Sequence, residues 1–483
     1  MELHIVLNSA KDLCGQLYRQ LREGIQSGHL AAGSKLPPTR VLAEQLGVSR
    51  KTVSEAYGRL RLENFLNGQA GRGTFVRTQA SRTLRLRSRE DLAGGAVLRR
   101  WEEMDTPLRH PGPEGRSRYE YIGGGATKSQ FPLAAWRRCV LHALRESAQA
   151  RGFYTQAEGM PVLREAIARH VAFSRGVKCS IGDMVVTNGA QQALDLVARV
   201  LVEPGCTVAV EDPGYPPARM LFASQGAQVH GVPVDEEGVL VAQIPSHARL
   251  IYVTPSHQFP LGIAMSLARR RALLERARAI GAIVIEDDYD SEFRYQGKPV
   301  DTLQSMDEEG IVAYVGTFSK VLLPELRLGY VIAPPAIRKA LVIAKHLTDW
   351  HSATTMQLTL AKFIDDGYLQ KHIRRCHGIY AARREKILAR FAGDLSPWLE
   401  AVPSSAGFHL TALFRKPVDL PGLLKLARRL DVGLYSLDGF YRASPPPQGL
   451  IFGFGGIESL DIDPSLDLVR DILLQLDRAG QPA

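Results

Sequence analysis

A single lysine, Lys320, lies between two apolar segments and is preceded by the hydroxyl side chains of Thr317 and Ser319. Residues 311–315 are apolar enough for a buried strand, and Arg327 follows seven positions after the lysine. A lone loop lysine is usually only solvated. A lysine beside groups that bind anions can instead form a Schiff base with a carbonyl compound. The rest of the sequence decides between these two interpretations.

Five apolar runs in the long C-terminal part end in polar or aromatic residues, and helical patterns alternate with them. This alternation indicates an α/β fold with a mostly parallel sheet. Because ligands bind beyond the carboxyl ends of strands in such sheets, we expect the five ends to line one pocket. The runs are DMVVT before NGAQ (188–191), TVAVE before DPGY (212–215), RLIYV before TPSHQFPLG (254–262), AIVIE before DDYD (287–290) and IVAYVG before TFSK (317–320).

Two of these ends carry groups suited to a phosphate. A helix beginning at Ala190 and Gln191 would expose free backbone N–H groups, although a plain strand-to-helix turn has the same pattern. Thr317, Ser319 and Arg327 would add hydroxyls and a positive charge to the same phosphate.

Two other ends carry partners for a flat ring. Tyr215 is suited to stack on such a ring, and equally to pack in a turn. Asp287 closes a buried strand, where a carboxylate needs a partner: either a protonated ring nitrogen or a structural Arg or Lys. Phosphate, ring, ring nitrogen and an imine-forming lysine together describe pyridoxal 5'-phosphate. We therefore predict that Lys320 forms a Schiff base with the aldehyde of this cofactor.

The N-terminal quarter has the pattern of a helix-turn-helix. Apolar residues every four positions over 13–25 predict an amphipathic helix. The stretch LPPTRVLAEQLGVSRKTVSEAYGRL (36–60) predicts two short helices, capped by Thr39 and Ser49, with a tight turn at Gly47. The first residues of the second helix meet the major groove in that geometry. Here they are Arg50, Lys51 and Thr52.

A hairpin is predicted over NGQAGRGTFV (67–76), with Arg72 at its tip, where a thin basic wing could enter a minor groove. A basic helix start is often only a solvated face, but the charge distribution favours DNA. The net charge is +10; residues 1–118 contain 20 Lys and Arg against 12 Asp and Glu, whereas the remainder contains 40 against 38.

Length and composition indicate a globular protein of two or three domains, with 483 residues of which 45% are hydrophobic. No apolar run approaches the roughly 18 residues of a membrane span, and the N-terminus does not have the pattern of a signal peptide. The five cysteines are scattered without a CxxC pair, which argues against a disulfide framework or a metal site and favours a cytoplasmic location.

The segment between the two parts loses its hydrophobic periodicity and mixes Arg, Gly and Pro, as a mobile linker does. A short helix is expected near residues 98–104. We predict a DNA-binding domain at 1–77, a linker at 78–118 and a large cofactor-binding domain at 119–483.

Residues 11–77, with LPPTRVLAEQLGVSRKTV and GRGTFV, resemble the winged helix-turn-helix of GntR-type bacterial transcription regulators. The resemblance implies contacts with double-stranded DNA through Arg40, Ser49, Arg50, Thr52, Arg72 and Thr74.

Residues 119–483 are similar to a fold-type-I aminotransferase domain, through YTQAEGMPVLREAIARH, TNGAQQALDL, EDDYDSEFRY and TFSK…LRLGY. The similarity implies that Asp287 binds the pyridine nitrogen and Tyr289 the ring hydroxyl. It implies phosphate contacts from Ala190, Gln191, Thr317 and Arg327. Tyr154 would reach the phosphate of the neighbouring subunit of a homodimer.

Two departures from the aminotransferase pattern bear on catalysis. The stretch TPSHQFPLG has no clear equivalent of the asparagine that contacts the ring hydroxyl; His257 is a substitute, or a loop histidine with a structural hydrogen bond. Aminotransferases also place an arginine for the substrate carboxylate three residues before a strand phenylalanine, and here that position is Ile451. Arg219 and Arg442 are candidates to compensate.

The whole chain resembles the MocR subfamily of GntR-type regulators. That resemblance favours a transcription regulator that senses pyridoxal phosphate, or its adduct with an amino compound, without productive turnover. The alternatives are an active aminotransferase with an accessory DNA-binding head, and a DNA-binding dimer whose large domain only joins subunits. The intact set of Asp287, Tyr289 and Lys320 argues against the last.

Overall fold

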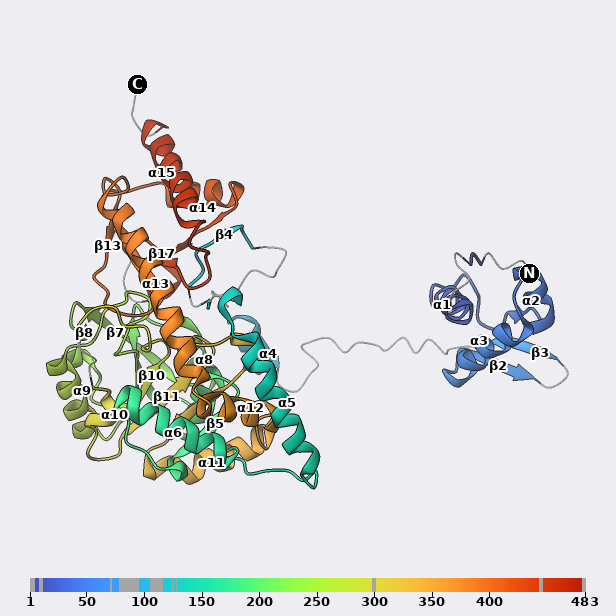
Figure 1. The fold of residues 1–483 in the computed structure, drawn as a ribbon, viewed down its shortest axis with the longest axis horizontal. Helices are drawn as coiled ribbons and strands as arrows, with labels where there is room; N and C mark the ends of the chain where they lie inside the picture. The colour runs from blue at the N-terminus through green and yellow to red at the C-terminus, as the bar shows by residue number, and fades with distance from the viewer. Residues whose placement is uncertain are drawn as a thin grey trace. The chain divides into compact units, whose positions relative to one another are not determined.

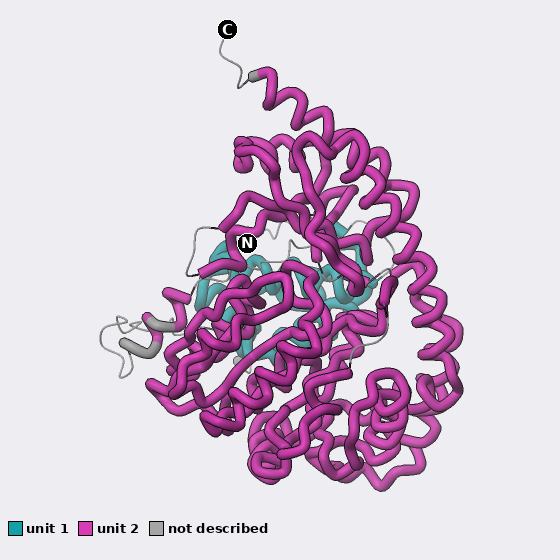
Figure 2. Tube along the Cα trace, turned by 90° about the vertical axis from the view of Figure 1, so that its left-hand side faces the viewer, with its two compact units in different colours: residues 1–95 teal, residues 96–483 magenta. Residues whose placement is uncertain are grey.

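The computed structural model describes residues 5–7, 12–69, 72–77, 95–104, 116–123, 125–126, 128–297, 301–442 and 446–479. The chain divides into two compact units, residues 1–95 and residues 96–483 (Figures 1 and 2). Each unit is described separately. Most of the expected linker, residues 78–94 and 105–115, lies outside the described residues. Between these stretches the helix α4 spans Gly95–Glu102, slightly earlier than the short helix expected near 98–104.

The first unit is a three-helix head with a small antiparallel sheet in the order β1-β3-β2. Its elements are α1 (Leu13–Gln26), β1 (Lys35–Leu36), α2 (Thr39–Leu46), α3 (Arg50–Leu62), β2 (Leu66–Gln69) and β3 (Gly73–Val76). The helices pack through one apolar cluster that includes Leu17, Leu42, Val53 and Leu60. The hairpin of β2 and β3 pairs Gln69 with Gly73, so the predicted wing is present.

The two helix starts in the helix-turn-helix differ from each other. Ser49 caps α3 as expected, because its hydroxyl accepts a hydrogen bond from the backbone N–H of Thr52 at 3.1 Å. The cap expected from Thr39 is wrong: Pro38 occupies the cap position of α2, and Thr39 is the first helical residue. Gly47 ends α2 with a φ of 62°, a conformation that glycine adopts without strain.

The second unit is built on an eight-stranded sheet in the order β5-β12-β11-β10-β9-β6-β7-β8. Its strands are β5 (Met184–Thr187), β6 (Thr207–Asp212), β7 (Gln228–Asp235), β8 (Gly238–Val239), β9 (Ala248–Val253), β10 (Ile283–Asp288), β11 (Val312–Thr317) and β12 (Gly329–Ile332). The helices of this part are α5 (Leu133–Gln149), α6 (Pro161–Arg175), α7 (Ala190–Leu201), α8 (Pro216–Ser224), α9 (Leu267–Ile280), α10 (Leu303–Met306), α11 (Pro335–Asp349) and α12 (Thr354–Asp365).

The sheet is mostly parallel, as the sequence predicts. Strand β10 runs parallel to both β9 and β11, and β6 runs parallel to β7 and β9. Strand β12 is antiparallel to both β11 and β5. As a result, β5 runs in the same direction as β11 and the other parallel strands. The carboxyl ends of β5, β6, β9, β10 and β11 therefore lie along one edge of the sheet.

Helices cover both faces of this sheet, so its central strands are buried on both sides. One apolar cluster joins α7, α8 and α11 to the sheet through residues such as Leu194, Phe222 and Leu341. Another joins α5, α6 and α12 to the opposite face, through residues such as Trp136 and Ile167. This double cover explains why the strands read as continuous apolar runs.

A smaller sheet follows, in the order β13-β14-β17-β16, with a separate pair of β15 and β4. Its elements are β4 (Tyr119–Glu120), the long helix α13 (Tyr368–Ala392), β13 (Leu399–Ala401), β14 (His409–Phe414), α14 (Leu420–Arg429), β15 (Val432–Gly433), β16 (Tyr435–Ser436), β17 (Gly449–Gly453) and α15 (Ile462–Ala479). None of the helices in the described ranges is long and apolar enough to span a membrane.

Candidate functional site

Lys320 follows the carboxyl end of β11, and its side chain is half-buried. Burial lowers the pKa of Lys320, and the nearby carboxylates of Asp290 and Asp287 oppose this effect. A lysine whose pKa is lowered has a larger share of neutral amine at neutral pH, and the neutral amine is the nucleophile. The lowered pKa favours the interpretation of Lys320 as an imine-forming residue over that of a solvated loop lysine, and the role of Lys320 stays a prediction.

Asp287 lies at the end of the neighbouring strand β10, and only 5% of its surface is exposed. The Tyr252 hydroxyl donates a hydrogen bond to its Oδ2 at 2.8 Å, whereas its Oδ1 is buried with no hydrogen-bond partner among the described residues. Burial raises the pKa of Asp287 to about 7, although the bond from Tyr252 acts in the opposite direction. No structural Arg or Lys forms an ion pair with this carboxylate in the described ranges.

Tyr289, His257 and Asp290 form one hydrogen-bonded group next to Asp287. The Tyr289 hydroxyl donates to the backbone carbonyl of His257 at 2.8 Å and lies 3.1 Å from the ring nitrogen Nδ1. That nitrogen also lies 2.9 Å from Asp290 Oδ2, and both side chains are buried. A Cβ on Gly407 would come within 2.0 Å of His257 Cε1, so this glycine permits the close packing that fixes the imidazole. Asp290 thus orients His257, and His257 orients Tyr289.

His409 on β14 adds a second imidazole, whose ring centroid lies 4.5 Å from that of His257. Burial, with the charges of His257 and Lys320, lowers the pKa of His409 well below its usual value, so it is neutral. Its Nε2 donates to the carbonyl of Pro260 at 3.0 Å. The polar atoms of His257, Asp290 and His409 lie within 4.8 Å of one another; His257 is hydrogen-bonded to Asp290, whereas His409 is bonded to Pro260.

The phosphate-binding region predicted from the sequence brings β5, α7 and β11 together. Gly189 precedes α7, so the N–H groups of Ala190 and Gln191 belong to the helix start, where no intrahelical acceptor exists. Arg327 donates to the carbonyl of Asn188 at 2.7 Å, and a Cβ on Gly189 would lie only 3.0 Å from its guanidinium.

The hydroxyls after β11 complete this region. The backbone N–H of Ser319 donates to Thr317 Oγ1 at 3.2 Å, whereas the Ser319 hydroxyl is buried with no partner in the described part of the chain. An enclosed hydroxyl beside helix N–H groups and a guanidinium is an arrangement suited to an oxyanion.

Tyr215 is the cap residue before α8 and packs edge-on against Phe259, with ring centroids 5.7 Å apart. Burial raises the pKa of Tyr215 to about 12, with a smaller effect from the charge of Asp287. Phe259 in turn lies edge-on to Tyr289 at 6.0 Å. The aromatic side chain expected at the ring therefore belongs to the same pocket.

Tyr154 lies apart from this group within its own chain. It is 74% exposed on the segment between α5 and α6, and its ring is 4.2 Å from that of Trp350. A role at the phosphate of a neighbouring subunit stays a prediction.

Ile451 lies on β17 in a small apolar cluster with Leu437 and Phe440. It is 2% exposed, so the position expected for a carboxylate-binding arginine is occupied by packed hydrocarbon. Arg219 donates weakly to the Gly439 carbonyl at 3.5 Å, and its pKa is lowered by burial and by the charge of Arg442. These two arginines are close enough to repel each other.

The pocket fits pyridoxal phosphate in its donor and acceptor groups. Asp287 Oδ1 is an unpaired buried acceptor, which a protonated ring nitrogen would satisfy. Ser319 Oγ is an unpaired buried hydroxyl two residues after β11, which a phosphate oxygen would satisfy. The sequence places Asp290 at one of the five strand ends but does not predict its bond to His257, and it does not assign Tyr252 or His409 to this pocket, because both lie on strands without any local signal.

The residues expected to contact DNA all belong to the head. Exposed side chains among them are those of Arg40 on α2, Ser49, Arg50 and Lys51 at the start of α3, and Arg72 in the wing. Thr52 is partly exposed, with its hydroxyl 2.8 Å from that of Ser49. Thr74 is 9% exposed, and its hydroxyl accepts a hydrogen bond from Arg61 at 2.8 Å.

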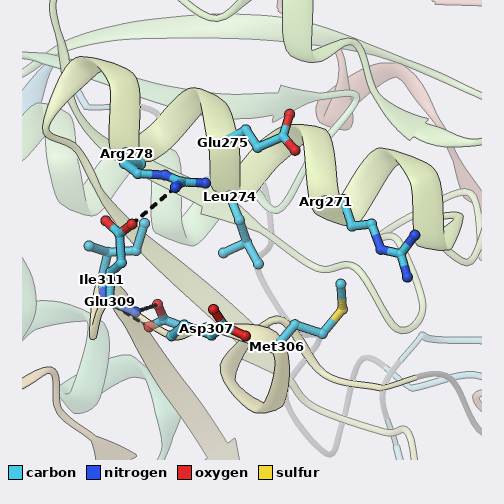
Figure 3. Close-up of a pocket in the computed structure, with 9 residues that line it drawn as sticks. Arg271, Leu274, Glu275, Arg278, Met306, Asp307, Glu309 and Ile311 are labelled. Carbon is cyan, nitrogen blue, oxygen red and sulfur yellow. Dashed lines mark hydrogen bonds and ion pairs between the residues drawn. The ribbon is translucent and has the colours of Figure 1, made fainter.

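A separate hollow of about 200 Å³ lies between α9 and the turn at residues 306–311 (Figure 3). Arg278 and Glu309 pair across it at 3.1 Å, and Asp307 accepts hydrogen bonds from the backbone N–H groups of the turn. These three charged groups hold the turn against α9.

The raised pKa of Asp287 predicts a pH dependence in the cofactor-free protein. The pKa of Asp287 is about 7 in the folded chain and 3.8 ordinarily, so its protonated form favours the folded state. This contribution to the free energy of unfolding is complete below about pH 4 and is lost as the pH rises through 7. We expect Asp287→Asn, which can still accept from Tyr252, to unfold at a less pH-dependent temperature between pH 5 and 8. Calorimetry would measure the unfolding temperatures of parent and variant at each pH. The underlying difference in the free energy of unfolding is a few kcal/mol at most. Equal pH slopes for parent and variant would contradict the assignment.

The comparisons with known proteins agree with both units. Residues 13–76 match the family of bacterial regulatory proteins, gntR family, and residues 125–429 match aminotransferase class I and II. The crystal structure of kynurenine aminotransferase from Pyrococcus horikoshii superposes with a TM-score of 0.70 and 27% identity, covering 76% of this chain and 93% of that one.

Curated relatives share the complete two-unit arrangement. The probable rhizopine catabolism regulatory protein MocR of Rhizobium meliloti is 36% identical over 468 residues, 96% of this chain and 94% of its own length. The HTH-type pyridoxine biosynthesis transcriptional regulator PdxR of Corynebacterium glutamicum is 32% identical over 464 residues, 96% of this chain and 95% of its own length. The chain therefore belongs to the MocR family of GntR-type transcriptional regulators, which join a helix-turn-helix head to a fold-type-I aminotransferase domain.

Proposed function

We propose that this chain is a transcription regulator whose large unit binds pyridoxal phosphate at Lys320 and whose head changes its affinity for an operator in response. The observation that carries the proposal is the coexistence, in one chain, of a half-buried lysine beside an unpaired buried carboxylate oxygen and a helix-turn-helix with a basic helix start. A regulator that acts on the chromosome would work in the cytoplasm.

Each cofactor residue has a defined part in this proposal. The aldehyde of bound pyridoxal phosphate supplies a carbon that bonds reversibly to amines. Asp287 would hold the ring nitrogen through Oδ1, while Tyr252 holds Oδ2. Tyr289, oriented by His257 and Asp290, would contact the ring hydroxyl.

The remaining groups would bind the phosphate of the cofactor and one face of its ring. The start of α7 at Ala190 and Gln191 would bind the phosphate together with Thr317, Ser319 and Arg327. Tyr215 would lie against the ring.

Sensing without turnover is the second part of the proposal. Transamination requires the substrate to be held with one bond at its α carbon perpendicular to the plane of the cofactor ring. An arginine achieves this by binding the substrate carboxylate through two parallel hydrogen bonds. Ile451 cannot, and a small misplacement can cost about a hundredfold in rate. An amino compound could then occupy the pocket and alter it without a complete reaction cycle.

A homodimer would complete the site. Large apolar side chains are exposed on α5, on the segment that follows it and at the end of α11, where a second copy would cover them. They are Leu133, Leu141, Leu144, Phe153, Leu347 and Trp350. Tyr154 contacts Trp350 in this region, so an interface here would bring it close to the partner subunit.

An active aminotransferase is the second candidate. Lys320, Asp287 and Tyr289 favour it, because these residues would serve catalysis as well as sensing. Arg219 and Arg442 would then have to bind the carboxylate in place of Ile451.

Two measurements on the full-length protein test the proposal. Fluorescence anisotropy would compare affinity for a duplex selected from a randomised library, with and without pyridoxal phosphate. Keto-acid production would be followed with the common amino acids as substrates. We expect operator affinity to change by about 5- to 150-fold, the usual range of coupling between two sites. Turnover should stay far below about 1 per second.

Indifference of the operator to the cofactor, together with turnover of about 1 per second or faster, would favour the enzyme and defeat the regulator proposal. Ile451→Arg sharpens the test, since it restores a carboxylate clamp. We expect keto-acid production to rise in this variant; because Ile451 is buried, only an unchanged rate in a variant that unfolds at the same temperature as the parent would show that the missing clamp is not what limits turnover.

A further inference from the structure

A polar crevice of about 230 Å³ lies behind the cofactor pocket, between the last turns of α6, the segment after β10 and the first turns of α13. The side chains that matter for its chemistry are His170, Ser174, Ser291, Glu292, Arg294 and Gln370. At roughly 30 Å³ per water, its volume corresponds to about eight waters, which suits a small metabolite and no drug-sized ligand. We refer to it as the Glu292 crevice.

Glu292 is the acidic group of this crevice, and one of its two carboxyl oxygens lacks a hydrogen-bond partner in the described part of the chain. This oxygen, Oε2, is enclosed by protein. Burial raises the pKa of Glu292 to about 8, and the charge of Asp288 adds to this effect. An unsatisfied buried polar group costs about 1–3 kcal/mol, so a ligand that donates a hydrogen bond here recovers that cost.

Arg294 is the basic group, and it also lacks a charged partner. Its Nη1 donates to the Ser405 hydroxyl at 3.0 Å, but no carboxylate lies within ion-pair distance in the described ranges. Burial and the charge of Arg175 lower its pKa, although an arginine stays protonated at neutral pH. The crevice thus contains an acid and a base that do not pair with each other.

The groups between these two charges are neutral. Burial lowers the pKa of His170 to about 4, so its ring is uncharged. Gln370 Nε2 donates to His170 Nδ1 at 3.1 Å, which places the ring proton on Nε2. By contrast, the hollow of Figure 3 has a closed ion pair between Arg278 and Glu309. The two hollows are similar in size, but among the described residues only the Glu292 crevice has an enclosed carboxyl oxygen with no hydrogen-bond partner.

We propose that the Glu292 crevice binds a small zwitterionic amino compound, with its ammonium group at Glu292 and its acidic group at Arg294, at a site separate from Lys320. A zwitterion offers both an ammonium donor to the unpartnered Glu292 oxygen, whose carboxyl releases its proton to solvent on binding, and an anion to Arg294, whereas a simple amine or a simple carboxylate offers only one of these. The neutral imidazole, amide and hydroxyl groups supply further hydrogen bonds without adding charge.

The crevice is connected to the cofactor pocket through Arg175. This arginine lines the crevice, pairs with Asp288 at 2.7 Å and donates to Ser256 at 2.8 Å. Asp288 is the neighbour of Asp287 on β10, and Ser256 is the neighbour of His257. A ligand in the crevice therefore contacts side chains whose partners lie directly beside residues of the cofactor pocket.

Isothermal titration of the full-length protein tests the proposal. The probes are glycine, alanine, β-alanine and 4-aminobutyrate, with propionate and ethylamine as matched compounds that each lack one charge of alanine. We expect at least one zwitterion to bind and both matched compounds to fail. Binding should persist in cofactor-free Lys320→Ala protein, in which no imine can form at that position.

Glu292→Gln and Arg294→Gln should each weaken binding at least tenfold, because a charged hydrogen bond contributes about 1.5–3 kcal/mol. Glu309→Gln, in the hollow of Figure 3, is the matched control and should leave binding unchanged. Absence of binding by every zwitterion at about 10 mM, ten times a weak dissociation constant of ~1 mM, would overturn the proposal. Binding that survives both crevice substitutions, or that is lost in Lys320→Ala, would place the ligand elsewhere.

Discussion

Lys320→Ala is expected to abolish the covalent attachment of pyridoxal phosphate, because the amine that forms the bond is removed. After borohydride treatment of the cofactor-loaded parent, mass spectrometry should find the reduced adduct on the peptide that contains Lys320. The variant should give no adduct and should lose the associated visible absorbance. The effect is all or none, since the neighbouring side chains Thr317, Ser319 and Arg327 cannot form an imine.

The physical reason for this selectivity is burial. The pKa of Lys320 is lowered mainly by its burial, and Asp290 and Asp287 only partly compensate. An exposed lysine keeps its usual positive charge and reacts less readily with an aldehyde. Lys339, exposed on α11, is therefore a suitable control, and Lys339→Ala should retain the adduct. An adduct found on any other lysine of the parent would show that the assignment of Lys320 is wrong.

The fold of the large unit could be predicted because its pattern is local and repeated. Each buried strand reads as a continuous apolar run followed by a polar end, and the parallel arrangement brings those ends to one edge. Asp287 and Lys320 were found in this way, since each directly follows or closes such a run. The Ser49 cap was equally visible, because capping depends on residues three positions apart.

What the sequence could not predict depends on contacts between distant positions. Tyr252 and Asp287 are 35 residues apart, and His409 and Pro260 are 149 apart, so no local spacing relates them. Thr39 failed as a cap because Pro38, with its fixed φ, already occupies that position.

The pairing of His257 with Asp290 falls in the same class. The sequence left open whether His257 contacts a cofactor or makes a structural hydrogen bond. The structure shows the structural bond to Asp290 and places Tyr289 on the same imidazole. A histidine held in this way can position the neighbouring tyrosine without itself contacting a ligand.

The largest effect expected in the head is on operator affinity, from Arg50→Ala and Arg72→Ala. Arg50 is the first residue of α3, directly after the Ser49 cap, and Arg72 lies in the connection of the β2–β3 hairpin. A bidentate arginine contact with a base contributes about 1–3 kcal/mol, so each variant should bind about 5- to 150-fold more weakly. Anisotropy with the selected duplex would measure the loss, at several salt concentrations.

The salt series separates the two kinds of contact that an arginine makes. Loss of a phosphate contact reduces the salt slope by about one, and it weakens binding to every sequence alike. Loss of a base contact weakens the selected duplex more than a scrambled one. Arg19→Ala is the matched control on α1, because Arg19 is already paired with Asp12 at 3.2 Å. Cofactor absorbance should be the same in all these variants, since Lys320 belongs to the other unit. If both Arg50→Ala and Arg72→Ala bind the duplex as tightly as the parent, α3 and the wing do not read DNA through these side chains.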